Sequence, residues 1–126
     1  MAENASFSPQ QIVCLEHHHH HLYCEVIQLV ESRNLCWVRP LFLAVLSKTV
    51  PAYHQLLTPK LLIDVRLTSD LLYPINLFRP ALDTEVIPLL AQVESQDTSL
   101  EVIEIAKQQL HRFITQVWQD NTNKFS

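Results

Sequence analysis

The hydrophobic positions of residues 22–30 fit both the spacing of a helix and the alternation of a strand. We favour a strand because the run is rich in β-branched residues and because a turn-like cluster, residues 31–34, separates it from a second apolar run at 35–45. Asn34 suits a left-handed turn position there. The pattern predicts a β-hairpin of strands near 23–31 and 35–45, with a helix over 22–31 as the alternative.

Pro40 interrupts the second of these runs. Its nitrogen cannot donate to a sheet ladder, so the strand is expected to end near Pro40 or to be an edge strand at that point. Residues 61–67 then alternate between apolar and charged, which is typical of an antiparallel strand with one covered face. A turn at 69–70 follows, and a further strand region is expected near 61–73.

Helical spacing replaces alternation towards the C-terminus. Apolar residues recur at three- and four-residue steps from Ile103 to Val117, and Thr98 with Glu101 matches a capping box, so we expect a helix over about 100–118. A shorter helix is expected within 84–93, where Pro88 is tolerated only in the first turn.

These elements predict an α+β fold: a small antiparallel sheet, open or curled into a partly open barrel, with a C-terminal amphipathic helix. An all-helical domain is the rival. Residues 47–60 hold two prolines and are expected to be a loop with a short helical turn near 52–57. We expect residues 1–21 to be a flexible histidine-containing segment and residues 22–126 to be a single globular domain.

The chain of 126 residues contains no glycine. This excludes phosphate-cradling loops, the nucleophile elbow and the dinucleotide fingerprint, which all need glycine. Turns with positive φ must use other residues, and Asn34 and Asn76 are the candidates. The cysteines can be combined on paper with His54 and an aspartate, but no such combination has diagnostic local context. We expect a protein that is not an enzyme and needs no cofactor.

Compartment and membrane association are predicted from three features. The longest apolar run, residues 41–46, is far shorter than the roughly 20 residues of a membrane span. The first six residues lack the basic start and apolar stretch of a secretory signal. The three cysteines are too few for a disulfide scaffold. We therefore expect a cytoplasmic protein with reduced thiols and no membrane span.

Five consecutive histidines, His17 to His21, are good ligand types for zinc, copper or nickel. If the segment were helical, His17 and His21 would lie one turn apart and could chelate one ion together. A metal-handling role through this run is one hypothesis. Low-complexity drift in a tolerant segment is the alternative.

Two stretches place Arg-Pro after an aromatic residue: Trp37 with Arg39, and Phe78 with Arg79. The net charge of −4 is uneven, because residues 33–79 are basic and both flanks are acidic. A basic face in residues 33–79, made by Arg33, Arg39, Arg66 and Arg79, would suit RNA. Neutralisation of these arginines within the fold is the alternative explanation.

Residues 22–30, 35–41 and 77–90 resemble segments of small uncharacterised cyanobacterial proteins. The resemblance covers a minority of the chain and implies no activity, ligand or catalytic residue. It implies only a cytoplasmic protein of a photosynthetic bacterium.

The leading functional hypothesis is a non-enzymatic protein-interaction or assembly protein that binds another protein or itself. Aromatic and arginine side chains are enriched at the energetic centres of interfaces. The candidate partner-binding residues are Trp37, Arg39, Phe78, Arg79 and Trp118. RNA binding through residues 33–79 is the first alternative, and metal handling with His17 and His21 as ligands is the second.

Overall fold

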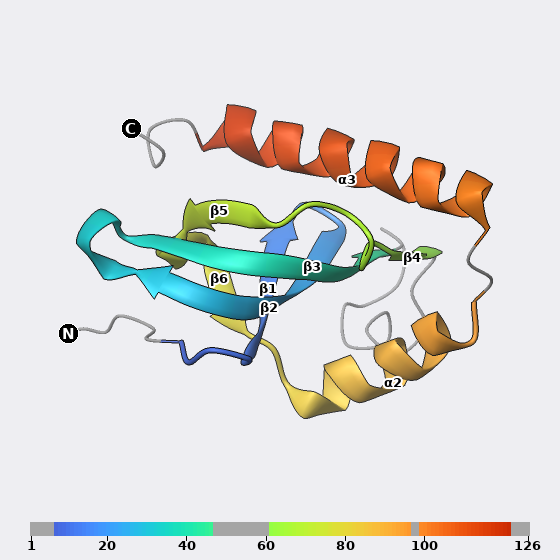
Figure 1. Cartoon of the computed structure of the whole chain (residues 1–126), viewed down its shortest axis with the longest axis horizontal. Helices are drawn as coiled ribbons and strands as arrows, with labels where there is room; N and C mark the ends of the chain where they lie inside the picture. Colours follow the sequence, from blue (N-terminus) through green and yellow to red (C-terminus); the bar gives the residue numbers. More distant parts are fainter. Residues whose placement is uncertain (1–6, 47–60, 97–98, 122–126) are drawn as a thin grey trace.

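A computed structural model describes residues 7–46, 61–96 and 99–121 of the chain. Within these ranges one antiparallel sheet of six strands carries an α-helix on each face, so the predicted α+β class is confirmed (Figure 1). The elements in chain order are β1 (Ile12–His17), β2 (His20–Val30), η1 (Glu31–Arg33), β3 (Leu35–Val45), β4 (Leu61–Asp64), β5 (Leu71–Pro74), η2 (Ile75–Leu77), β6 (Phe78–Pro80), α2 (Asp83–Glu94) and α3 (Leu100–Asp120). The sheet is open, in the order β4-β3-β2-β1-β6, and β5 also pairs with β3.

The central hairpin of β2 and β3 lies where the sequence predicts it, and the helical alternative for residues 22–31 is wrong. Its turn is the short 3-10 helix η1, which ends at Asn34 with φ 57° and ψ 37°. The Asn34 N–H donates to the Glu31 carbonyl at 3.1 Å. Asn34 therefore adopts the left-handed conformation expected of it, whereas Asn76 is not among the described residues with positive φ.

Strand β3 continues through Pro40, and it does so at an irregular point of the sheet. Its first part, Leu35 to Val38, pairs with β5, and its last part, Phe42 to Val45, pairs with β4. Pro40 lies between these two parts, so neither β4 nor β5 pairs with β3 at this residue. The expectation that β3 is an edge strand at Pro40 is therefore confirmed on this side, and the alternative that the strand ends there is wrong. The register with β2 also shifts next to Pro40, which marks a bulge. The single strand region expected near 61–73 is two strands along one edge of β3.

The histidine run belongs to the sheet, so the domain boundary expected at residue 21 is wrong. Residues 12–17 form β1, which lies between β2 and β6 and buries Val13 and Leu15 completely. The histidines form the end of β1, the turn and the start of β2. The sequence therefore shows a polar run in place of the apolar pattern by which a strand is recognised. Residues 1–6 and 47–60, which include the expected loop and His54, lie outside the described residues.

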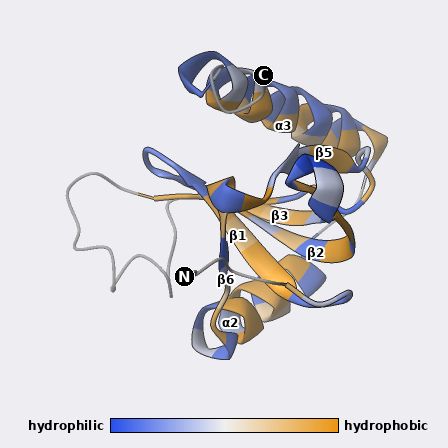
Figure 2. Cartoon of the chain, turned by 90° about the vertical axis from the view of Figure 1, so that its left-hand side faces the viewer, coloured by the Kyte–Doolittle hydropathy of each residue, from blue (hydrophilic) through white to orange (hydrophobic). Residues whose placement is uncertain are grey.

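Two apolar clusters hold the helices against opposite faces of the sheet (Figures 1 and 2). Helix α3 contributes Ala106, Leu110, Phe113 and Val117 to one cluster, together with sheet residues such as Val13, Leu22 and Val38. Helix α2 contributes Val86, Leu89 and Val93 to the other, together with sheet residues such as Cys14, Tyr23 and Phe42. Figure 2 shows the hydrophobic sides of both helices turned towards the sheet. The amphipathic C-terminal helix thus packs on the sheet.

The ends of the helices refine two expectations. Helix α3 begins after Ser99, whose hydroxyl accepts from the Val102 N–H at 3.3 Å, while Thr98 lies outside the described residues. In α2, Pro88 is the sixth helical residue and stands in the second turn, not the first. Neither of these two α-helices of the described chain has the length and apolar character needed to cross a membrane.

Candidate functional site

Trp37 and Arg39 lie on the sheet face opposite α3, beyond the end that α2 covers. Their neighbours Cys36 and Val38 are buried in the cluster beneath α3, and side chains alternate along a strand, so Trp37 and Arg39 point the other way. Trp37 is 39% exposed. Within the described residues, neither helix covers this part of β3 on the face that carries Trp37 and Arg39.

One carboxylate holds both of these side chains. The Trp37 indole N–H donates to Asp70 Oδ2 at 2.9 Å, and the Arg39 guanidinium donates to Asp70 from Nε at 3.2 Å and from its terminal nitrogen at 3.4 Å. These hydrogen bonds, first from Arg39 and then from Trp37, lower the pKa of Asp70. Asp70 was not among the predicted interface residues, because nothing local to residues 69–70 distinguishes it from an ordinary turn residue.

The strand register adds neighbours on the same face. Gln28 of β2 and Leu72 of β5 lie directly opposite Trp37, and Glu25 lies opposite Arg39. Leu72 is 52% exposed. We call the six residues of this surface the sheet patch: Glu25, Gln28, Trp37, Arg39, Asp70 and Leu72. It combines an aromatic ring, an aliphatic side chain and charges of both signs.

The other three predicted interface residues do not join the sheet patch. Phe78 is buried in the core beneath α3. Arg79 points to the other face of β6, into a network of acids described below. Trp118 is exposed on α3, which covers the sheet face opposite the patch. Of the five candidates, the structure brings together only Trp37 and Arg39.

Glu85 of α2 is the centre of the buried network. It is 3% exposed and accepts from the Tyr23 hydroxyl at 2.6 Å, from Arg79 at 2.8 and 2.9 Å, and from the Leu82 N–H at 2.9 Å. Burial alone would raise the pKa of this carboxyl, but the hydrogen bonds from Arg79, Tyr23 and Leu82 outweigh it and hold the pKa at about 2. Arg79 also pairs with Glu16, and its own pKa is raised, chiefly by Glu85. This network joins α2, β6, β1 and β2.

The five histidines are distributed over a hairpin tip. His17 pairs with His20, and His21 pairs with Glu16, so adjacent positions point to opposite faces. His17 and His20 contact Phe113 of α3, with ring centroids at 6.3 and 5.8 Å, whereas His21 lies near Tyr23 at 6.3 Å on the other face. The predicted ligands His17 and His21 are thus on opposite faces of the sheet.

Two sets of metal-ligand types result from this arrangement. On the α2 side, Cys14, Glu16 and His21 have ligand atoms within 4.8 Å of one another. On the α3 side, His17, His18 and Asp120 do so as well. Glu16 and Asp120 could not be recognised from sequence, because each meets its histidines only through strand pairing or helix packing.

The cysteines of the chain are all free, buried thiols. Burial raises the pKa of Cys14 and of Cys24 well above the ordinary value, and raises that of Cys36 to about 11. The three thiols are therefore protonated near neutral pH and shielded from solvent. His54, which the combinations allowed on paper include, lies outside the described residues.

The arginines of the basic segment are largely paired with acids. Arg66 donates to Asp64 at 2.8 and 3.0 Å and to Glu94 at 2.7 Å. Arg39 pairs with Asp70, and Arg79 pairs with Glu85 and Glu16. Neutralisation within the fold accounts for three of the four arginines that the RNA hypothesis needs.

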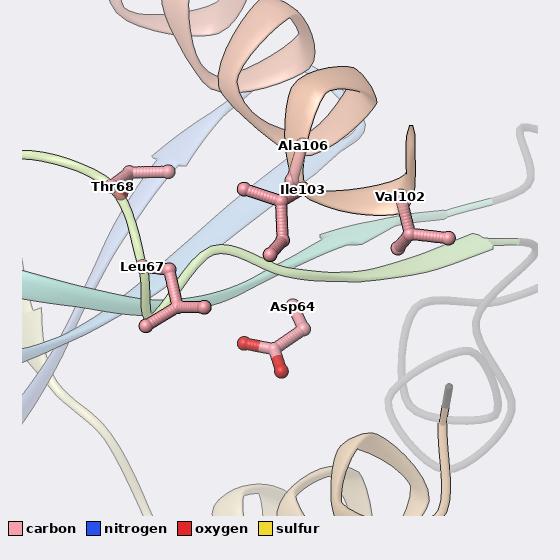
Figure 3. A pocket seen from close by; sticks show the side chains of 6 residues that line it. All are labelled: Asp64, Leu67, Thr68, Val102, Ile103 and Ala106. Carbon is pink, nitrogen blue, oxygen red and sulfur yellow. The ribbon is translucent and has the colours of Figure 1, made fainter. Parts of the chain in front are cut away.

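A small pocket lies between the first turns of α3 and the segment after β4 (Figure 3). It is lined by Asp64, Leu67, Thr68, Val102, Ile103 and Ala106. Its free volume of about 10 Å³ admits no more than a water molecule. The Asp64 carboxylate seen there is already bonded to Arg66. This pocket is too small for an organic ligand.

Comparison of the chain with protein-family models, with curated proteins and with solved structures finds no match. The site geometry alone therefore supports the functional proposal.

Proposed function

We propose that the protein is a non-enzymatic protein-binding domain and that its sheet patch binds a second copy of the chain. The observation that carries this proposal is the Asp70 carboxylate, which holds Trp37 and Arg39 side by side on a part of the sheet that neither described helix covers. Trp and Arg are the residue types most enriched at interface hot spots. Because Asp70 already orders both, binding loses less side-chain entropy than it would with free rotamers.

The charges of the patch favour a second copy as the occupant. Glu25 and Arg39 lie opposite each other on β2 and β3 and face the same way. A two-fold axis that runs between these strands, in the plane of the interface, brings Glu25 of each copy against Arg39 of the other. Such a surface is complementary to itself, and Trp37 and Leu72 supply apolar area beside the charges.

We further propose that this assembly forms in the cytoplasm. The free and buried thiols of Cys14, Cys24 and Cys36 support this location, because they suit a compartment that keeps cysteine reduced.

Sedimentation velocity over a range of micromolar concentrations tests the proposal. We expect a reversible dimer, and we expect Trp37→Ala to weaken it by about thirtyfold, the effect of an interface hot spot. Glu25→Arg should weaken it as well, because it places like charges against each other across the two-fold axis. Trp118→Ala is the matched control, since it removes an exposed indole from α3 and should leave the dimer intact.

Two results would overturn the proposal. One is a monomer at every concentration. The other is a dimer that tolerates Trp37→Ala and Glu25→Arg but is lost in Trp118→Ala. Circular dichroism of each variant checks that the sheet and helices are retained, so that a loss of dimer is not a loss of fold.

A further inference from the structure

The tip of the β1–β2 hairpin meets the C-terminal end of α3. His17 is the last residue of β1, His18 is in the turn, and Asp120 is the last residue of α3. Asp120 Oδ2 lies 2.9 Å from His17 Nε2 and 3.6 Å from His18 Nε2. One carboxylate oxygen thus faces two imidazole nitrogens that come from the other end of the chain.

We propose that His17, His18 and Asp120 bind a divalent transition-metal ion of the kind that imidazole and carboxylate ligands prefer, with Zn²⁺ as the probe. A tetrahedral zinc ion with bonds of about 2.1 Å keeps its ligand atoms about 3.4 Å apart. The distances of 2.9 and 3.6 Å bracket this spacing, and all three ligand atoms lie within 4.8 Å of one another. Small side-chain rotations would complete the coordination.

The surroundings leave these ligands available. His17 Nε2 is buried, and among the described residues its one polar partner is the Asp120 carboxylate, with which it forms an ion pair. The His17 side chain is 12% exposed, whereas His18 is 68% and Asp120 54% exposed. The site therefore has a buried inner ligand and an open outer side, where water or a further group can supply the fourth ligand. The negative end of the α3 dipole also favours a cation there.

Two contacts hold the histidines in place. The His17 ring packs edge-on against Phe113 at a centroid distance of 6.3 Å, and the His18 ring lies 4.2 Å from that of His17. His18 has φ 55°, in the left-handed region that residues with a side chain seldom adopt. The hairpin keeps this conformation at a position that aims an imidazole at Asp120.

The second cluster, Cys14, Glu16 and His21, is a poorer site for a cation. The Arg79 guanidinium pairs with Glu16 and lies near the Cys14 thiol, so a positive charge already occupies this neighbourhood. Cys14 is fully buried, and burial favours its protonated form. We therefore assign the ion to the α3 side of the hairpin, a proposal that does not depend on the sheet patch.

Zn²⁺ titration of untagged protein by calorimetry, after purification without a nickel column, tests the site. We expect one ion per chain, with affinity reduced at least about tenfold in His18→Asn and in Asp120→Asn. Asparagine suits both positions, because it tolerates the left-handed turn at His18 and matches the shape of Asp120. His21→Gln, from the same run, and His111→Asn, an exposed histidine of α3, are the controls and should bind zinc as the natural chain does.

The spectrum of the Co²⁺-loaded protein gives an independent readout. We expect visible bands of a tetrahedral ion without the near-ultraviolet charge-transfer band of a thiolate ligand. The assignment is overturned if Asp120→Asn binds zinc normally, if His21→Gln weakens binding as much as His18→Asn, or if a thiolate band appears. The first result would mean that the histidine run binds metal without α3, and the other two would place the ion at Cys14, Glu16 and His21.

Discussion

The Tyr23 hydroxyl donates to the Glu85 carboxylate at 2.6 Å, although 62 residues separate the two in the chain. Tyr23 is the fourth residue of β2 and is buried, and Glu85 stands in the first turn of α2. The same carboxylate accepts from Arg79 of β6 and from the Leu82 N–H that begins the helix. Glu85 therefore joins the first turn of α2 to β2 and β6, beside the apolar contacts that hold the helix on the sheet.

Replacement of Glu85 should destabilise the fold strongly. In Glu85→Gln the partly buried Arg79 loses its charged partner on α2, and we expect the free energy of unfolding to fall by about 3 kcal/mol. Glu94→Gln is the matched control, since Glu94 is also on α2 and paired with an arginine but is exposed. It should change stability by no more than about 0.5 kcal/mol. Urea unfolding measures both, and equal losses would contradict a special role for Glu85.

Stability should depend on pH through the same carboxyl. The pKa of Glu85 is about 2 in the folded protein and 4.5 without the fold, so the folded state favours the ionised form. The stabilisation is complete above the unfolded pKa and is lost as pH falls from 4.5 towards 2. The difference in unfolding free energy between the natural chain and Glu85→Gln should therefore shrink over this interval. A difference that stays constant would contradict the low pKa.

The cysteines should resist modification in the folded protein. All three thiols are buried and have raised pKa values, so neither access nor the thiolate form is available near neutral pH. We expect a maleimide to label none of them on the timescale on which it labels an exposed thiol. In denaturant all three should react, as mass spectrometry will count. Rapid labelling of Cys14 without denaturant would show that the network around it opens.

The turn at Asn34 offers a test of backbone strain in a chain without glycine. Asn34 has φ 57°, a conformation that glycine adopts freely and alanine does not. Asn34→Ala should lower the free energy of unfolding by about 1 kcal/mol, whereas Asn34→Gly should leave it nearly unchanged. If both variants lose stability equally, the side chain of Asn34 matters more than its backbone conformation.

The sequence predicted the elements whose signals are local. Residues 31–34 mark the turn of the β2–β3 hairpin, and the regular apolar spacing from Ile103 to Val117 marks α3, because turn chemistry and periodicity are properties of neighbouring residues. Strand β1 was missed since its C-terminal end is histidine and its apolar core is only Ile12 to Leu15. Four consecutive apolar residues followed by polar ones show no alternation, so the sequence pattern does not indicate a strand there.

The sites depend on contacts that no local pattern records. Asp70 lies 33 positions from Trp37 and meets it because β5 pairs with β3. Residue type also does not show which aromatic and arginine side chains lie on the surface and which lie in the interior. Phe78 and Arg79 resemble Trp37 and Arg39 in sequence, but β6 pairs with β1 so that Phe78 lies opposite Leu15 in the core and Arg79 opposite Cys14.

Five identical residues at the tip of a hairpin carry no information about its alignment. A shift of one strand past the other within His17 to His21 would exchange one imidazole for another, so the tip cannot distinguish correct from incorrect pairing. The flanking pairs Leu15–Leu22 and Cys14–Tyr23 make that distinction, because a shift would turn apolar side chains away from α3 and the Tyr23 hydroxyl away from Glu85. The number of histidines is therefore not what determines the register of the sheet. A histidine gained or lost at the turn would lengthen or shorten the hairpin tip, while the pairing of the remaining strand residues stayed the same.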